Sequence, residues 1–430
     1  MFASPLNTAT IKTTSYKVVL PFYVYAAISF LVATILLFTS TDAFTAHYFS
    51  PHLLAITHAM ALGWGTMIIL GASHQLVPVL AEGKLYSNKL AYTSFIFAAI
   101  GIPMLVYAFY IFDMGPLAKW GGRCIIIAVV AYLINISMSI KQSKNENIHA
   151  IYAFTATWWL LVTVTFGLAL VYNNTYPLLP HDSFHYLPLH AHAGMVGWFF
   201  LLVIGVASRL IPMFLISKYT NNKLLWVIYF LLNGALLFYF IFFYFISETA
   251  VTFISVGSVF IAIILFIYFC IQAYKKRLRK QVDEQTKISI LSIFILLIPI
   301  ILLTMVIFTL ITTSGEKVNF ILAYGFLIFF GWLTSIILGM TFKTMPFIVW
   351  NKVYHHRSSL GKTPNPKDLF NHIVFKMMSI FYLSGLVVFV VGILFSLILI
   401  MKIGAALLII AAALYNWNVI KLMIHKPHML

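Results

Sequence analysis

The string Gly-Trp, six residues, Gly, six residues, Pro occurs three times in this chain. The copies begin at Gly63, Gly197 and Gly331, so successive copies are 134 residues apart both times. Constant spacing of this kind indicates an internal triplication. The first two copies carry a histidine five residues before the glycine, His58 and His192, whereas the third carries Phe326 there. The copies therefore share a framework and differ at one position, where two of the three have a histidine that can bind a ligand.

Twelve apolar stretches are each long enough to cross a membrane. Hydrophobic residues make up 62% of the 430 residues and charged residues 9%, which excludes a water-soluble protein. A helix rises about 1.5 Å per residue and needs roughly 20 residues to span hydrocarbon about 30 Å thick. The stretches begin near Leu20, His52, Leu90, Cys124, Ala150, Leu187, Leu224, Val251, Ile288, Phe320, Val374 and Ile403.

These stretches predict an all-α integral membrane protein with one membrane domain of twelve transmembrane helices. Three copies of the motif divide it into repeats of four helices at approximately 18–146, 147–285 and 286–421, with the motif on the second helix each time. Four crossings return the chain to its starting side, so the repeats must be parallel and related by an axis along the membrane normal. We therefore expect a pseudo-threefold arrangement of three arcs.

The basic residues are concentrated in alternate loops of the predicted membrane protein. The net charge is +17, and 21 of the 27 lysines and arginines fall in alternate inter-helix segments. A membrane explains this pattern better than a nucleic-acid partner, because cytoplasmic loops carry the excess of Lys and Arg. The pattern predicts a multi-pass protein of the cell's inner (plasma) membrane, embedded in the lipid bilayer, with both termini in the cytoplasm.

Four histidines lie within the predicted spans: His58 and His74 on the second, and His190 and His192 on the sixth. An ionisable residue inside a membrane is a functional hypothesis by default. His190 and His192 project about 200° apart on a helix, so they must face different compartments. His58 and His192 are repeat equivalents and share one depth. Two such imidazoles could hold one flat metallomacrocycle, and haem fits that description.

The stretch HAHAGMVGWFFLLVIGVASRLIP, residues 190–212, resembles the His-x-His helix in subunit I of haem-copper oxidases, especially the cbb3-type oxidase and nitric oxide reductase branch. Those proteins also have twelve helices in three arcs, with a haem-ligating histidine on the second helix. The resemblance implies that His58 and His192 are axial ligands of a low-spin haem b. It implies that His190 faces a second, high-spin haem, so the chain would hold one haem or two.

The sequence departs from that family in two places. The family's His-x-His lies on the tenth helix, where this chain has Tyr324 and Phe326, and the seventh span has no histidine to complete the family's copper ligands. The chain is also similar to the NnrS family of haem and copper membrane proteins, which places histidines on its second and sixth helices. An alternative copper site would use the outer histidines His181 and His185 with His47 or His52, because copper accepts several imidazoles.

All ten acidic residues fall in loops or at helix ends, which argues against proton pumping and ion-coupled transport. Arg123 stands at the outer end of the fourth span, where it would either pair with a haem propionate, which needs a cation, or extend to the lipid headgroups. His74 is either a further polar ligand or an inner hydrogen-bonding residue.

The leading hypothesis is a membrane haem b protein, in electron transfer or in binding or reduction of a small gas, nitric oxide or oxygen. It would be an oxidoreductase of the haem-copper oxidase or nitric oxide reductase type if it is an enzyme. The resemblance implies quinol or cytochrome c as electron donor and a small partner subunit. The alternatives are a transporter or channel with a histidine-lined polar centre, and a scaffold in which the histidines only bridge helices.

Overall fold

A computed structural model describes residues 14–80, 83–142, 147–243, 248–312, 318–354 and 363–427. Within these ranges the chain is helical, and its β-structure is limited to an isolated bridge between Ser217 and Arg277. Twelve helices are long and apolar enough to cross a membrane. The expectation of an all-α membrane protein with twelve spans is confirmed.

Several spans are divided into shorter helical elements. The first four spans are α1 (Tyr16–Thr39), the continuous run α2 (Pro51–His58), η2 (Ala59–Thr66) and α3 (Met67–Leu80), then α4 (Asn88–Tyr110) and α5 (Pro116–Lys141). The next four are α6 (Ile148–Asn173), the run α7 (Leu187–His192), η3 (Ala193–Phe200) and α8 (Leu201–Leu215), then α9 (Asn222–Phe242) and α10 (Glu248–Lys275). The last four are α11 (Glu284–Ile295) with α12 (Leu297–Thr312), the run α13 (Val318–Phe326), η4 (Leu327–Leu333) and α14 (Thr334–Tyr354), then α15 (His372–Leu394) and α16 (Ile398–Met423). The short 3-10 helices η1 (Thr41–Thr45) and η5 (Pro366–Asp368) lie in loops.

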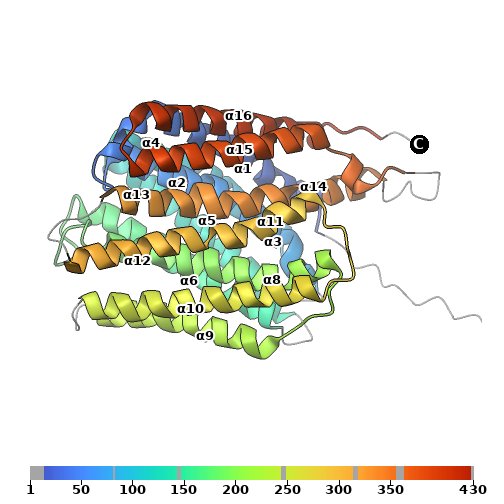
Figure 1. Ribbon diagram of the computed structural model, residues 1–430, viewed down its shortest axis with the longest axis horizontal. Coiled ribbons are helices and arrows are strands. Elements are labelled where there is room, and N and C mark those ends of the chain that lie inside the picture. Colours follow the sequence, from blue (N-terminus) through green and yellow to red (C-terminus); the bar gives the residue numbers. More distant parts are fainter. Residues whose placement is uncertain are drawn as a thin grey trace, which may run out of the picture.

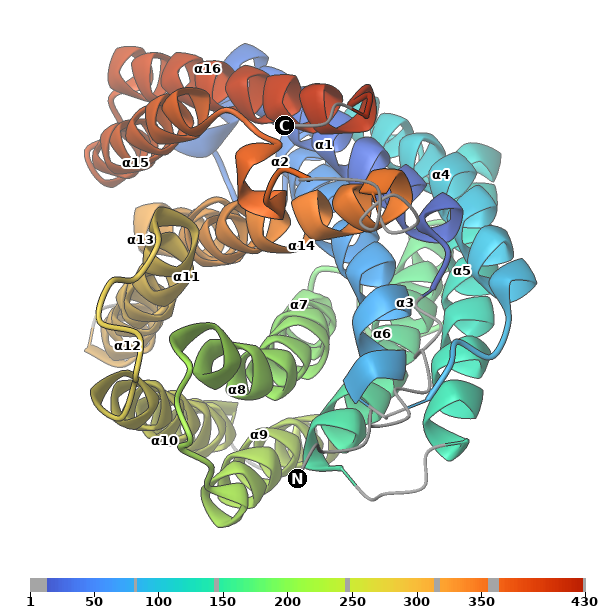
Figure 2. The same ribbon diagram turned by 90° about the vertical axis from the view of Figure 1, so that its right-hand side faces the viewer.

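The three motif-bearing spans form the centre of the molecule. The helices run side by side along its long axis (Figure 1), and the end-on view shows α2–α3, α7–α8 and α13–α14 surrounded by the others (Figure 2). In the most apolar stretches of these three spans 72%, 72% and 78% of the residues are buried, against 28% to 56% in the other nine. The repeated motif therefore marks the helices that meet around the pseudo-threefold axis.

Each central span contains a π-helical segment at the same place in its repeat. The segments η2, η3 and η4 begin immediately after His58, His192 and Phe326. A π-helical turn closes its hydrogen bonds over five residues and so changes the direction in which later side chains point. Such segments often lie at functional sites. Here the third copy has one without a histidine, so the segment belongs to the shared framework.

The tryptophans of the motif join neighbouring repeats. Trp198 Nε1 donates to Thr66 Oγ1 at 3.0 Å, and Trp64 Nε1 donates to Thr334 Oγ1 at 3.1 Å. The third tryptophan, Trp332, packs edge-on against Phe200, which occupies the position equivalent to Thr66, with ring centroids 4.6 Å apart. Each indole thus contacts the same position of an adjacent central helix, and the three contacts hold the pseudo-threefold centre together.

The end of the molecule at which α1 begins is here called the inner end. All six helices that begin at this end have a side-chain N-cap. Because the spans alternate in direction, these are the odd-numbered ones, capped by Ser15, Ser87, Asn147, Asn221, Asp283 and Asn371. A capping side chain satisfies amide groups that have no partner within the helix. These caps therefore fix where each helix starts at the inner end.

The predicted division into repeats remains a prediction. Residues 143–146, around the first boundary, lie outside the described ranges, and the second boundary falls two residues inside α11. The described acidic residues lie in loops or at the first residue of a helix, while Glu82, Glu146 and Glu316 lie outside the described residues. The described part of the chain therefore has no carboxylate in the middle of a span.

Lys343 of α14 binds the carboxylate of Asp283, which also caps α11 and lies 3.3 Å from Arg279. Burial alone would raise the pKa of Asp283, but hydrogen bonds from Lys343 and Thr286 outweigh it and hold the pKa below its ordinary value of 3.8. A lowered pKa means that the stabilisation is complete above pH 3.8 and is lost as the pH falls through the lowered value.

We expect Lys343→Met to destabilise the protein by about 1 kcal/mol, because it leaves a half-buried carboxylate without its closest cation. Thermal unfolding in detergent should show a lower melting temperature at pH 7 and a smaller difference from the unsubstituted protein near pH 3. The control is Arg279→Met, since Arg279 is the more exposed partner at 42% against 14%. Equal losses in the two variants would contradict the assignment of the ion pair to Lys343.

Candidate functional site

A cavity of about 320 Å³ lies at the outer end of the molecule, between the first and second repeats and reaching the pseudo-threefold axis. It is lined by α2, α4, α5, α6, α7, α13 and the π-helical segments, and most of the lining side chains are aliphatic or aromatic. Its volume is in the range of small-molecule and cofactor sites. Two imidazoles, those of His58 and His190, enter this apolar space from opposite sides.

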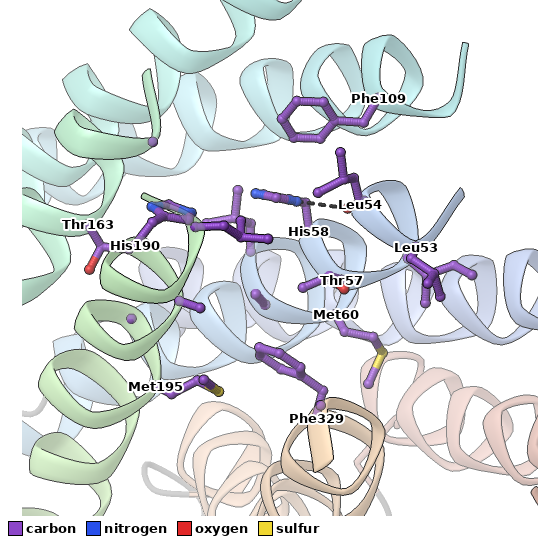
Figure 3. A pocket seen from close by; sticks show the side chains of 18 of the residues that line it. Leu53, Leu54, Thr57, His58, Met60, Phe109, Thr163, His190, Met195 and Phe329 are labelled. Carbon is purple, nitrogen blue, oxygen red and sulfur yellow. Dashed lines mark hydrogen bonds between the residues drawn. The ribbon is translucent and has the colours of Figure 1, made fainter. Parts of the chain in front are cut away.

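The rings of His58 and His190 face each other. Their centroids are 6.2 Å apart and their planes differ by 17°. Figure 3 shows the two imidazoles pointing toward one another, with Phe109 beside His58 and Thr163 beside His190. The Phe109 ring lies 4.6 Å from the His58 ring. The two opposed imidazoles of this apolar cavity therefore come from the central helices of the first two repeats, and α4 and α6 flank them.

His58 is held in one orientation by its own helix. Its Nδ1 lies 2.7 Å from the carbonyl oxygen of Leu54. An Nδ1–H that donates to a carbonyl leaves the lone pair of Nε2 directed away from the backbone, and this arrangement is usual for a metal-ligating histidine. The local helix therefore fixes the tautomer that a ligand needs.

His190 occupies space that a missing side chain provides. A Cβ atom at Gly167 of α6 would lie 2.6 Å from Cε1 of His190, closer than side chains approach one another. The glycine therefore lets the imidazole lie against the α6 backbone.

His192 does not line this cavity, here called the first compartment. It lies between α7 and α13, in a space here called the second compartment, and its neighbour Tyr324 also lines the first. Nδ1 of His192 is 2.7 Å from the carbonyl oxygen of Pro188, as His58 Nδ1 is from that of Leu54. Its ring is nearly parallel to that of Tyr324 on α13, with centroids 6.3 Å apart and planes 22° apart, and the tyrosine hydroxyl lies 3.4 Å from Nε2. The second compartment thus repeats the geometry of the first, with a tyrosine in place of the second histidine.

This arrangement differs from the pairing of His58 with His192 that the sequence suggests. The reason is rotational symmetry. Repeat-equivalent residues are related by rotation about the axis, so each one faces the space between its own central helix and the next, and two of them do not face each other. The partner of His58 stands two residues earlier on the next central helix, at His190, and the partner of His192 is Tyr324 by the same rule. His190 consequently shares the compartment of His58, and His192 lies on the other side of its helix.

The other candidate residues do not join this pair. The Arg123 guanidinium donates to the Tyr172 hydroxyl and lies over the Trp120 ring, so it is directed away from the cavity that Gly122 lines. His74 is fully buried on α3, beside Tyr132, and neither of its ring nitrogens has a partner in the described structure.

The expected outer copper site is only partly assembled. The His181 and His185 rings lie 4.5 Å apart, while His47 stacks on Tyr48 and His52 on Tyr110. Among the described residues there is no group of three or more His, Cys, Asp or Glu side chains placed to hold a metal ion. The described cysteines, Cys124 and Cys270, are free thiols.

Comparison with solved structures shows which fold the chain has. The structure is similar to a chain of a haem-copper terminal oxidase dimer determined by cryo-electron microscopy, with a TM-score of 0.61 and 12% sequence identity over 97% of this chain and 86% of the other. The chain has the haem-copper oxidase fold. No protein-family model matches the sequence, and no curated protein does. The similarity therefore lies in the path of the chain.

Within the haem-copper oxidase fold, the residues of the first compartment fit a haem. Metal–imidazole bonds are about 2 Å long, so two such bonds plus the half-width of each ring give a centroid separation of roughly 6 Å, as found for His58 and His190. The apolar lining suits a porphyrin, and the two imidazoles supply a nitrogen ligand from each side of the cavity.

The sequence alone does not identify the residues that pack against the two histidines and position them. Gly167 and Phe109 carry no motif, and only their position one helix away from the histidines gives them a role. Tyr324 was visible as the residue equivalent to His190 in the third copy. The spacing of 132 residues, two less than the repeat, relates both His58 to His190 and His192 to Tyr324. That spacing is the signal from which the two pairs could have been found.

Proposed function

We propose that this protein is a membrane haem b protein that transfers electrons through a haem held between His58 and His190. The observation that carries the proposal is the parallel, opposed pair of imidazoles in an apolar cavity. A bound haem would supply one-electron redox chemistry. His58 and His190 would hold the haem from both sides and leave no room for a substrate, so this site would be suited to electron transfer and not to catalysis.

The protein's own residues would hold and insulate the cofactor. The Leu54 carbonyl keeps His58 in the ligating tautomer, and Gly167 gives His190 room to approach. Phe109 and the aliphatic lining exclude water, which raises the energetic cost of charge at the site and so tunes the reduction potential. The electron donor, a quinol or a cytochrome c, would be met at the outer end of the protein, and the termini would lie in the cytoplasm.

A second candidate function concerns the compartment of His192. Its Nε2 is prepared as in His58 but faces a tyrosine hydroxyl. His192 would hold a haem there if the Tyr324 hydroxyl, now 3.4 Å from Nε2, moved aside, and such a haem would supply the chemistry for binding or reduction of nitric oxide or oxygen. In this proposal His58 and His190 would hold the cofactor for electron transfer, and the compartment of His192 would receive the gas.

An optical spectrum of the purified protein tests the electron-transfer proposal. We expect protein produced with an ample haem supply to show the sharp reduced-minus-oxidised bands of a low-spin haem b. Low-temperature electron paramagnetic resonance of the oxidised form should show the signal of a bis-imidazole haem. Membranes from the same host without this chain provide the control. Haem-free protein after full loading would reject the proposal and favour a transporter or channel.

A further inference from the structure

A second cavity, of about 110 Å³, lies on the pseudo-threefold axis in the inner half of the protein. Fifteen of its eighteen lining residues form five sets of repeat-equivalent positions, one residue from each central helix. Two of these sets are Ile68, Leu202 and Ile336, and Ala72, Val206 and Met340. The cavity is therefore a product of the triplication and is lined by residues of all three repeats.

The lining offers nothing that would hold water. Fourteen of the eighteen residues are apolar, and each of the four hydroxyl groups already has a protein partner. Ser73 donates to the carbonyl oxygen of Ile69 and Thr344 to that of Met340, while the Tyr23 hydroxyl pairs with Thr344 and Thr341 accepts from Tyr415. A buried water needs two to four polar partners, whereas an apolar cavity of about 150 Å³ in another protein stays dry and binds xenon.

One layer of side chains separates this cavity from the first. It consists of the equivalent residues Gly65, Phe199 and Leu333, of which Phe199 lines the outer cavity and Leu333 the axial one. A Cβ atom at Gly65 would lie 2.7 Å from Leu333 and 3.0 Å from Phe199. The glycine lets the two larger side chains meet on the axis, so the partition between the cavities is one residue thick.

We propose that the axial cavity binds a small apolar gas molecule. Its volume suits a diatomic molecule or a noble-gas atom, its lining is dry, and the thin partition places an occupant next to the outer cavity. The proposal goes beyond electron transfer and does not rest on it, because neither His58 nor His190 lines this cavity.

Xenon is the probe. Crystals of the full chain pressurised with xenon should show an anomalous scattering peak on the axis between Val206 and Ile336, whether or not haem is bound. The variant Ala72→Met places at residue 72 the side chain found at the equivalent Met340, and it should reduce xenon occupancy at least tenfold. The matched control is Ala413→Met on the exposed face of α16, which should leave occupancy unchanged.

Three results would overturn the proposal. They are a wild-type protein without xenon on the axis, ordered water in the cavity of the same crystals, and full occupancy in Ala72→Met. If Ala72→Met does not fold, Ala207→Leu fills the same cavity from the next repeat and replaces it. A xenon peak in protein that never binds haem would sustain this inference while the electron-transfer proposal fails, so the two outcomes are distinguishable.

Discussion

Replacing either His58 or His190 by alanine should abolish the low-spin haem signal, whereas replacing His192 should preserve it. The reason is that the first two imidazoles share one cavity with their rings 6.2 Å apart, and His192 faces Tyr324 in another compartment. The measurement is electron paramagnetic resonance of the oxidised protein, together with haem content per chain. We expect both single variants to lose the signal completely, because one remaining imidazole cannot enforce the low-spin state.

Chemical rescue distinguishes lost ligation from misfolding. In His58→Gly, free imidazole should enter the vacated space and restore the low-spin spectrum, which a misfolded protein would not allow. The contrary result is equally clear. Loss of the low-spin signal in His192→Ala with retention in His190→Ala would restore the pairing of His58 with His192 suggested by the sequence, and would show that the central helices are rotated from the positions described.

The second large effect is expected from a single methyl group. Gly167→Ala places a Cβ atom 2.6 Å from Cε1 of His190, so the imidazole must move away from α6. Displacing a ligand by disturbing its support typically weakens metal binding roughly 10-fold to 100-fold. We therefore expect Gly167→Ala to show a comparable loss of haem affinity and a mixed or high-spin spectrum, measured by haem titration of the apoprotein.

The matched control adds the same methyl group to the same cavity. A Cβ atom at Gly194 would meet Thr163 Cγ2 at 3.2 Å and would not touch His190. Gly194→Ala should consequently retain low-spin haem with nearly unchanged affinity. Equal loss in both glycine variants would mean that the cavity tolerates no added volume and that the contact with His190 has no special role.

The architecture followed from the sequence because membrane helices leave strong signals. Span length, the loop distribution of Lys and Arg, and the constant spacing of the Gly-Trp motifs predicted twelve helices around a pseudo-threefold axis, and the structure has them. The π-helical segments after His58, His192 and Phe326 could not be predicted. Apolar periodicity does not distinguish one extra residue in a turn from an ordinary helix.

The site was harder to predict than the fold. Membrane histidines singled out His58, His190 and His192, but depth alone did not determine which of them meet. That depends on the rotation of each central helix about its own axis, which the packing of Gly167, Trp198 and their neighbours fixes. Arg123 shows the same limit. It was predicted at the end of the fourth span, but α5 begins at Pro116, and the direction of its side chain, toward Tyr172 and Trp120, was set by aromatic partners on two helices.

The repeat equivalents of His58 and His190 form an internal series in the sequence. The positions that hold His58 and His190 in the first pair hold His192 and Tyr324 in the second, and by sequence position Phe326 and Ile56 in the third. The supporting backbone, with its π-helical segment, is common to all three. One polypeptide thus contains the same backbone scaffold with two histidines, with one and with none. The contribution of the scaffold to ligand binding can therefore be separated from that of the side chains within a single protein.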